Sequence, residues 1–376
     1  MKKRIAIIGS GIAGLTLVSL LKDNFNFEFV VYEKEDKLNL DEGFGIQLSV
    51  NSISILNKVG FNQLNKNEKH HPPKLDFYSA NCKKIFDLDL TAFNSKNEKY
   101  TTLKRSSLIK FLKEKLLSNS IIFRKEINRI EQAKERIHIN FVDGSKDEVD
   151  YLIVSDGVFS KTKSVIENKI FKPIYYGAFA IRAQIKNQKI SNFDSNNISL
   201  VMGSNAHLVF YPINQAKEIN IVFIIRKKLE NHIDMNQILN NTIFKENKNL
   251  ENLFKGNFTS WPLYISSKPV KSIYKNIFYV GDAFYTFPPT MAQGASQAIE
   301  SAYEIFNLIK NNHPDIQNVY FNNRLKRTNL IIKRSKFNYF IFHFTNQILK
   351  SLRNLILKFL LKNKKFINRY LGKVYK

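Results

Sequence analysis

A glycine-rich segment near the N-terminus restricts the fold of this chain more than any other feature. Residues 9–14 read Gly-Ser-Gly-Ile-Ala-Gly and follow directly on a β-branched apolar run at residues 4–8. Residues 12–22 have helical composition, and residues 27–32 form a second apolar run. A strand, a glycine turn, a helix and another strand in this order predict a βαβ unit.

Three glycines and one acidic residue predict a dinucleotide site in this unit. Gly9, Gly11 and Gly14 fit the pattern G-x-G-x-x-G, which permits a tight turn and brings a pyrophosphate close to the helix N-terminus. Glu33 ends the second strand, where a carboxylate accepts hydrogen bonds from an adenosine ribose. An acid there disfavours a 2′-phosphate, so these residues predict FAD or NAD. A glycine turn without a ligand is the alternative.

Length and composition limit what the rest of the chain can be. For 376 residues about two domains are expected, and no linker rich in Pro, Gly or Ser separates them. The 44% of hydrophobic residues exclude a disordered chain. Cys82 is the single cysteine, which excludes an intramolecular disulfide and a multi-cysteine metal site. The N-terminal apolar run is too short for a signal peptide, so we expect a cytoplasmic protein.

Alternating and helical patterns predict the remaining elements. We expect β-hairpins with turns at residues 79–81 and 143–144, and a larger, mostly antiparallel sheet between residues 171 and 225. The expected helices lie at residues 50–59, 106–117 and 292–309, the hairpins at residues 75–90 and 136–154, and a short buried strand at residues 277–280.

Four separated segments share their pattern with one enzyme family. They are Gly43–Asn51, Arg105–Leu108, Val154–Ser160 and the stretch Gly281–Ala295. In this order they resemble the FAD-dependent aromatic hydroxylases, the single-component flavoprotein monooxygenases of the salicylate, hydroxybenzoate and hydroxynicotinate hydroxylase group. Taken singly, such segments are ordinary turns or helix caps, but four of them in the right order are far more specific.

The resemblance implies that the dinucleotide is FAD, and it assigns the contacts. Asp282 would bind the ribitol, and the segment from Pro289 to Ala295 would pass the reactive edge of the isoalloxazine. Lys163 stands where the family usually has arginine, and Tyr285-Thr286 where it often has His and Pro. The residues implied against FAD, besides the three glycines and Glu33, are Gly45, Ile46, Arg105, Asp156, Gly281, Asp282, Pro289, Gly294 and Ala295.

With this resemblance, the predicted fold is α/β. A Rossmann-like FAD-binding domain would be interleaved with a mostly antiparallel β-sheet substrate domain, and a helical C-terminus would follow. The FAD-binding domain would comprise residues 1–72, 101–170 and 271–310; the substrate domain, residues 73–100 and 171–270; and the basic helical C-terminal region, residues 311–376.

The implied activity is hydroxylation of a small phenolic or N-heteroaromatic substrate. It would use NAD(P)H and O₂ and proceed through a flavin C4a-hydroperoxide. NAD(P)H would bind only transiently, in line with the single G-x-G-x-x-G pattern of the chain. A membrane-associated hydroxylase of a quinone pathway and a flavin-binding protein without hydroxylase activity are the alternatives.

A histidine beside the substrate would suit the role of general base, because its pKa lies near the working pH. His207 shares a strand face with Tyr211, and their segment resembles the family segment that carries a base histidine and a substrate-contacting tyrosine. We therefore predict His207 as the base, with Tyr211 and Gln293 as hydrogen-bond partners of the substrate. A histidine packed in the sheet is the alternative. Gln47 and Arg182 also match family positions.

The last part of the chain is strongly basic. The net charge is +26, and residues 316–376 contain 15 Lys or Arg and no Asp or Glu. Within them, residues 348–360 follow helical spacing, with an apolar stripe and basic residues elsewhere. We expect this helix to pack on the substrate domain, with contact to an anionic membrane as the alternative. No recognised fold points to nucleic acid, and we expect a monomer or a homodimer.

Overall fold

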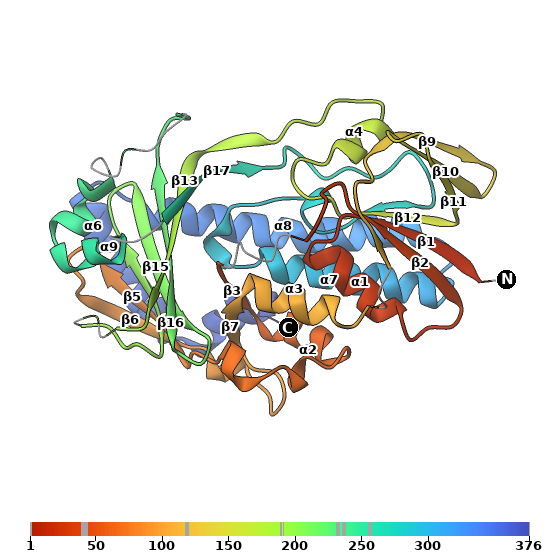
Figure 1. The fold of residues 1–376 in the computed structure, drawn as a ribbon. Helices are drawn as coiled ribbons and strands as arrows, with labels where there is room; N and C mark the ends of the chain where they lie inside the picture. The colour runs from red at the N-terminus through yellow and green to blue at the C-terminus, as the bar shows by residue number, and fades with distance from the viewer. Residues whose placement is uncertain are drawn as a thin grey trace.

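The computed structural model describes residues 2–38, 44–116, 120–188, 190, 192–230, 234, 238–254 and 258–375. Gly43, the first residue of one of the four family-like segments, lies outside these ranges. Figure 1 shows two β-rich layers at opposite ends of the molecule, with helices α7 (Gly294–Lys310) and α8 (Ile316–Phe342) extending between them.

A parallel sheet of five strands forms one layer. Its strands, in spatial order, are β18 (Ile277–Tyr279), β12 (Tyr151–Val154), β1 (Lys3–Ile8), β2 (Phe27–Tyr32) and β8 (Ile121–Ile122). Helix α1 (Ile12–Leu21) follows β1 in the chain, and helix α3 (Arg105–Lys113) precedes β8. Ile5 and Ile7 of β1 are fully buried in the apolar cluster that contains α1 and α7 residues. The predicted βαβ unit is confirmed.

A smaller antiparallel sheet adjoins this layer. It is β11-β10-β9, with bounds Lys146–Val149, Arg136–Phe141 and Ile127–Ala133. A second small antiparallel sheet, β3-β7-β4, with bounds Gly45–Leu48, Thr101–Lys104 and Lys69–His70, lies against the second layer. The hairpin turn at Asp143-Gly144 is confirmed, because β10 pairs with β11 across it. The prediction that this hairpin extends to Val154 is wrong. Residues 151–154 instead form β12, whose four buried apolar residues suit the interior of a parallel sheet.

The second layer is a seven-stranded sheet. Its strands, in spatial order, are β17 (Phe258–Ile265), β13 (Ile174–Lys186), β16 (Glu218–Arg226), β15 (Ala206–Ile213), β14 (Ile198–Met202), β5 (Lys74–Ser79) and β6 (Lys84–Asp89). Adjacent strands are antiparallel except β14 and β5, which are parallel. The sheet therefore joins the hairpin at residues 74–89 to β14, which begins more than a hundred residues later.

The two faces of this sheet have different neighbours. On β15, Leu208 and Phe210 belong to the apolar cluster that contains helix α6 (Thr242–Lys245). Tyr211 and Ile213 point the other way, into a cluster that includes Phe287 and Met291. The predicted helices at residues 50–59 and 292–309 are confirmed as α2 (Val50–Asn57) and α7, and the one at residues 106–117 as α3, which ends at Lys113; residue 117 itself lies outside the described residues. The other short helices before α8 include α4 (Lys161–Ile166), a 3₁₀ helix at Lys248–Phe254 and single turns at Phe61–Gln63, Lys66–Glu68, Thr91–Phe93, Gly281–Ala283 and Pro289–Met291.

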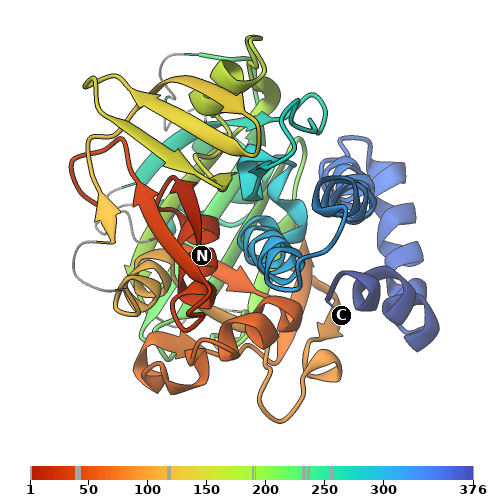
Figure 2. The same cartoon turned by 90° about the vertical axis from the view of Figure 1, so that its right-hand side faces the viewer.

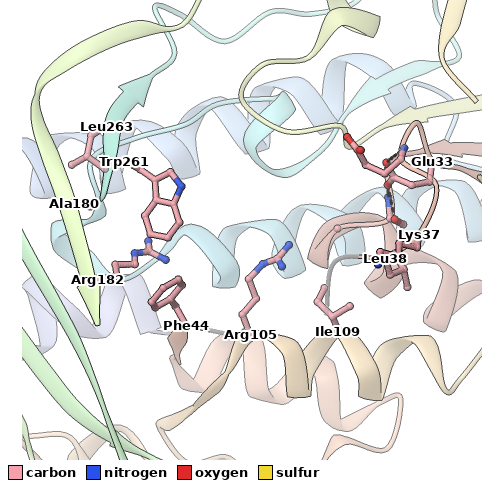
Figure 3. A pocket seen from close by; sticks show the side chains of 13 residues that line it. Glu33, Lys37, Leu38, Phe44, Arg105, Ile109, Ala180, Arg182, Trp261 and Leu263 are labelled. Carbon is pink, nitrogen blue, oxygen red and sulfur yellow. Dashed lines mark hydrogen bonds between the residues drawn. The ribbon is translucent and has the colours of Figure 1, made fainter. Parts of the chain in front are cut away.

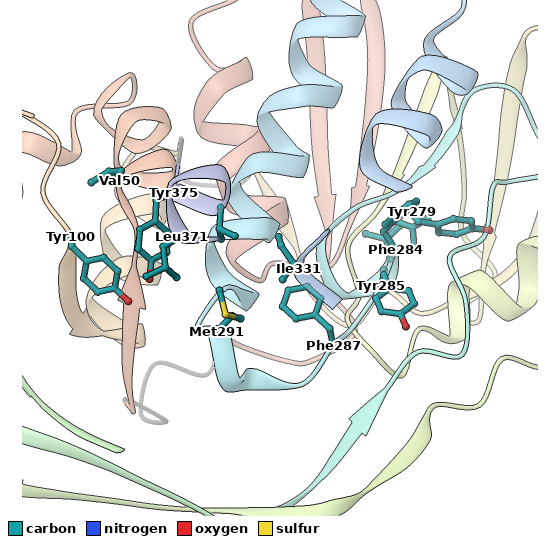
Figure 4. Close-up of a cluster of buried hydrophobic side chains, with 14 of the residues drawn as sticks. Val50, Tyr100, Tyr279, Phe284, Tyr285, Phe287, Met291, Ile331, Leu371 and Tyr375 are labelled. Carbon is teal, nitrogen blue, oxygen red and sulfur yellow. The ribbon is translucent and has the colours of Figure 1, made fainter. Parts of the chain in front are cut away.

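The C-terminal region is helical, as predicted. After α8 come α9 (Gln347–Leu360), α10 (Lys364–Ile367), a π-helical turn (Asn368–Gly372) and α11 (Lys373–Tyr375). In Figure 2 this dark-blue part of the chain lies at the right-hand edge of the molecule. The last residues return to the core, where Leu371 and Tyr375 lie near Tyr100 (Figure 4).

Helix α9 has its apolar stripe on the outside. The buried residue of this helix is Arg353, whereas Ile348, Leu355 and Phe359 are exposed. The side that packs on the protein, through Arg353 and Lys350, is therefore not the apolar side that the pattern predicts to be covered. Among the described residues, we find no helix that is both long and apolar enough to span a bilayer.

Candidate functional site

The glycine turn after β1 is shaped by close backbone contacts. Gly9 has a φ of +95°, and a β-carbon added there would lie 2.8 Å from the carbonyl oxygen of Ser155. A β-carbon on Gly14 would collide with the carbonyl oxygen of Gly9. Gly11 differs, because a β-carbon there would meet nothing within 4 Å. Gly9 and Gly14 thus allow tight packing, while Gly11 leaves open space at the start of α1.

A cavity of about 380 Å³ opens beside this turn. It runs from the start of α1 and the end of β2 toward the seven-stranded sheet (Figure 3). Glu33 lies at one end, where its carboxylate accepts a hydrogen bond of 2.9 Å from the backbone N–H of Ser10. The walls are Ser10, Gly11, Glu33, Glu35, Lys37, Leu38, Phe44, Arg105, Ile109, Ala180, Arg182, Trp261 and Leu263. An elongated ligand with an adenosine at the Glu33 end would fit this arrangement.

The other end of the cavity is cationic and aromatic. The Arg182 guanidinium carbon lies 5.8 Å and 5.5 Å from the ring centres of Phe44 and Trp261. Burial lowers the pKa of Arg182, and nearby Arg105 lowers it further. Within the described residues, Nε of Arg182 has no hydrogen-bond partner. Arg105 begins α3, and its backbone N–H donates to Phe44 over 2.9 Å. Two arginines thus line the cavity: Arg105, which the family resemblance implies against FAD, and Arg182, which matches a family position.

The Asp-Gly segment after β12 carries a buried acid. Asp156 Oδ2 accepts a 3.3 Å hydrogen bond from the Thr162 backbone N–H, while Oδ1 has no partner among the described residues. Burial raises the pKa of this carboxyl. Lys163, in place of the usual arginine, donates from Nζ to the carbonyl oxygen of Ala283 over 2.7 Å. It thereby links the Asp-Gly segment to the Gly281–Ala283 turn, a contact that sequence reasoning did not anticipate.

The turn after β18 lies against the start of α1. Gly281 has a φ of +62°, and a β-carbon there would lie 3.1 Å from the β-carbon of Ala13. Asp282 follows it and is accessible to solvent, although protein atoms surround it closely enough to raise its pKa to about 6. The structure therefore brings the second predicted FAD segment next to the glycine turn of the first.

The predicted flavin-facing segments also meet. Gly45 lies in β3, where its N–H donates to Asn220 Oδ1 of the seven-stranded sheet over 2.6 Å. Ile46 follows in β3. Pro289 begins a single helical turn, and Gly294 and Ala295 open α7. Ser49, just after β3, accepts a hydrogen bond from Gln293, so the two segments are in direct contact.

Gln293 differs from the role expected for it. Its side chain is fully buried, and its Nε2 donates to Ser49 Oγ over 2.9 Å. Its Oε1 accepts a hydrogen bond from Gln297. Both ends of the amide are therefore engaged inside the protein, and Gln293 holds α7 against the β3 segment rather than reaching toward a substrate.

His207 and Tyr211 share one face of β15, as the spacing predicts. His207 is buried, and its Nδ1 lies 2.6 Å from Nε2 of His343 at the end of α8. Burial lowers the pKa of both imidazoles. Sequence reasoning missed His343, because the two histidines are 136 residues apart and no local pattern connects them.

Tyr211 is part of a second polar group. Burial raises the pKa of its hydroxyl, against the opposing effects of the Arg182 charge and a hydrogen bond with Gln47. The Gln47 Oε1 in turn accepts a 2.8 Å hydrogen bond from the Tyr100 hydroxyl. The walls of the 380 Å³ cavity include neither His207 nor Tyr211. The bond from Gly45 to Asn220 nevertheless connects β3 to this part of the sheet, because Asn220 is paired with Tyr211.

Comparison with known proteins agrees with this geometry. A family model described as FAD binding domain matches residues 2–312. The chain is 23% identical over 356 residues to 6-hydroxynicotinate 3-monooxygenase of Bordetella bronchiseptica, covering 88% of this chain and 90% of that one. It is also 23% identical over 314 residues to 3-amino-4-hydroxybenzoate 2-monooxygenase of Streptomyces cremeus, covering 79% and 76%.

A solved structure shares the whole fold. The HpxO protein of Klebsiella pneumoniae, in complex with FAD and uric acid, superposes with a TM-score of 0.85 at 16% sequence identity. The match covers 99% of this chain and 96% of that chain. At this identity the similarity concerns the fold, which is shared from the parallel sheet to the C-terminal helices.

Proposed function

The chain belongs to the FAD binding domain family and is a FAD-dependent monooxygenase, and from this premise we propose that it hydroxylates a small aromatic substrate with NAD(P)H and O₂. The curated relatives named above are monooxygenases of a hydroxynicotinate and an aminohydroxybenzoate, which supports a phenolic or N-heteroaromatic ring as substrate. When bound and reduced by NAD(P)H, FAD supplies the oxygen-activating chemistry. The protein has to bind FAD, orient the ring, exclude water and move a proton.

FAD would lie along the cavity between Glu33 and the Arg182 end. The open space at Gly11 leaves room for the pyrophosphate at the N-terminus of α1, and Glu33 is placed to accept hydrogen bonds from the ribose. Asp282, next to this turn, would accept a hydrogen bond from the ribitol. Asp156 Oδ1, which has no hydrogen-bond partner among the described residues, would be a further acceptor for FAD.

The observation that supports the substrate assignment is the 2.6 Å hydrogen bond from the Gly45 N–H to Asn220 Oδ1. Asn220 is paired with Tyr211 across β16 and β15, so this bond holds strand β3 beside the part of β15 that carries Tyr211 and His207. A ring held between these elements would meet Tyr211 as a hydrogen-bond partner and His207 as a base. The surrounding side chains are largely apolar and buried, which excludes water from the reacting groups.

His207 would accept the phenolic proton at Nε2. Its Nδ1 is engaged with His343, so Nε2 is the ring nitrogen that remains outside the pair. Burial lowers the pKa of His207 to about 3, so the imidazole is neutral in the free protein but a weak base, and contact with the phenolate that forms would have to raise this pKa for the proton to be held. Removal of the substrate proton makes the ring more electron-rich and more reactive toward oxygen transfer.

Stopped-flow oxidation of the reduced protein tests this proposal. We expect the purified protein to be yellow with non-covalent FAD, and hydroxylated benzoates or pyridines to accelerate NAD(P)H oxidation. Mixing the reduced, substrate-bound protein with O₂ should give a transient C4a-hydroperoxide absorbance and hydroxylated product. Peroxide formation without product for every ring tested would instead indicate a flavoprotein without hydroxylase activity. A colourless protein that takes up no added FAD would refute the assignment altogether.

A second candidate is a membrane-associated hydroxylase of a quinone precursor. The observation that favours it is the exposed apolar stripe of α9. It would use the same FAD and base and would differ only in a more lipophilic phenol. Including alkylated phenols in the substrate screen distinguishes the two candidates.

A further inference from the structure

Helix α9 exposes an unusual amount of apolar surface. The relative exposures are 77% for Ile348, 50% for Leu352, 68% for Leu355 and 75% for Phe359. Leu349 and Ile356 complete the stripe, and both are also exposed. Six large apolar side chains on one side of one helix form a contiguous surface, whereas single exposed apolar residues are normal. We call these six residues the α9 stripe.

The inward side of the same helix is held by polar contacts. Arg353 is buried and donates from a terminal guanidinium nitrogen to the carbonyl oxygen of Ile341 over 3.1 Å. Lys350 donates from Nζ to Ser204 Oγ over 2.8 Å. Leu357 adds apolar contact to the core on this side. These contacts fix the rotation of the helix, so the stripe faces outward because the opposite side is specifically bound.

Cationic residues border the stripe. Lys358 is exposed in the last turn of α9, next to Phe359, and Lys362, Lys364 and Lys365 are exposed just beyond the end of the helix at Leu360. Residues 316–376 contain no Asp or Glu. An apolar stripe with a cationic border is complementary to a surface that is apolar inside and anionic at its edge.

We propose that α9 binds the surface of an anionic lipid membrane. The stripe enters the boundary between headgroups and acyl chains, while the bordering lysines contact anionic headgroups. A helix of 14 residues is about 21 Å long, shorter than the roughly 30 Å of a bilayer core, so it lies in the plane of the surface. This inference concerns the surface alone and does not depend on the substrate.

Charge argues against a second copy of the chain as the occupant. Pairing two α9 stripes would bring the lysines of both copies together without any acidic residue of this region to offset them. An anionic lipid surface removes the same repulsion and covers the same apolar area.

Flotation with lipid vesicles tests the proposal. We expect the FAD-loaded protein to float with vesicles of phosphatidylglycerol and phosphatidylcholine, and to stay unbound with pure phosphatidylcholine. The double variant Leu355→Ser, Phe359→Ser should bind the anionic vesicles about tenfold less. Lys358→Glu, Lys362→Glu should have a similar effect, and high salt should weaken binding of the wild-type protein.

A matched control distinguishes binding through the α9 stripe from nonspecific binding through any exposed apolar residue. Phe25 is 84% exposed and lies in the turn after α1, so Phe25→Ser should leave vesicle binding unchanged. Flavin absorbance of every variant confirms that it is folded. The proposal is overturned if the wild-type protein does not float with anionic vesicles, or if the stripe variant floats equally well. A dimer in sedimentation equilibrium that is lost in the stripe variant, without vesicle binding, would assign the surface to a second copy instead.

Discussion

His207 and His343 form a hydrogen-bonded pair, with 2.6 Å between Nδ1 of His207 and Nε2 of His343. This contact determines which nitrogen of the His207 ring carries its proton, and therefore whether Nε2 can accept one. If His343 Nε2 accepts, His207 keeps its proton on Nδ1 and its Nε2 is free to take one; if His343 donates, Nε2 of His207 carries the proton. The end of α8 therefore influences the state of a residue on β15.

The first prediction concerns this base. His207→Ala should retain FAD and NAD(P)H oxidation but yield less hydroxylated product per NAD(P)H, because the ring is no longer activated. Removal of a general base typically slows the assisted step by about 10²–10⁴-fold. The measurement is the ratio of product to NAD(P)H consumed, with Tyr211→Phe as a variant that should show a smaller loss. An unchanged ratio across the pH range where histidine titrates would make His207 a packing residue.

The second prediction concerns stability against pH. Burial lowers the pKa of both histidines in the folded protein, so the unfolded chain binds more protons below about pH 6.5. The free energy of unfolding should therefore fall as the pH falls below that value, by up to about 1.4 kcal/mol per pH unit for each histidine. Urea unfolding at pH 7.5 and pH 5 measures it. The double variant His207→Gln, His343→Gln should lose less stability between these two pH values, and an equal loss would contradict the assignment.

The third prediction concerns Asp282. Asp282→Ala removes the expected ribitol acceptor, and a hydrogen bond to a charged group is worth about 1.5–3 kcal/mol, so the affinity for FAD should fall roughly tenfold or more. Titration of the apoprotein followed by flavin fluorescence gives the affinity. Asp23→Ala is the control, because that side chain is 84% exposed at the end of α1 and should leave FAD binding intact.

The fourth prediction compares two glycines. Gly14→Ala places a methyl group against the carbonyl oxygen of Gly9, and such overpacking typically costs about 1–3 kcal/mol of stability. Gly11→Ala meets no neighbour within 4 Å and should fold normally, yet it should weaken FAD binding by narrowing the approach to the helix N-terminus. Thermal unfolding and FAD titration of both variants test the contrast. A Gly11→Ala variant that is less stable than the Gly14→Ala variant would contradict this prediction.

Local patterns predicted much of the fold. The βαβ unit, the hairpin turn at Asp143-Gly144 and helices α2, α3 and α7 each depend on neighbouring residues, so their periodicity is readable from the chain. β12 was assigned to the wrong sheet because its partners, β1 and β18, are distant in sequence. A short apolar run does not reveal which sheet it joins.

The site was predictable by segment and less so by side chain. The family pattern gave the segments around Gly45, Asp282 and Pro289, but not the direction in which Gln293 points. That direction depends on Ser49 and Gln297, two contacts that no spacing rule contains. The orientation of α9 was missed for a similar reason, since a periodic pattern locates an apolar stripe and does not say whether the body of the protein covers it.

In both large sheets, strands that are neighbours in space are far apart in the sequence, and this has a consequence for folding during protein synthesis. A ribosome releases the N-terminus first, at about 5–20 residues per second, but β1 lies between β2 and β12, and the edge strand β18 comes only at Ile277–Tyr279. The nascent chain must therefore carry unpaired strand edges through most of translation. In the same way, one edge of β5 stays unpaired until β14 has been synthesised. We expect truncated chains that end before β18 to require chaperones and to aggregate without them, whereas a released full-length chain can close both sheets together.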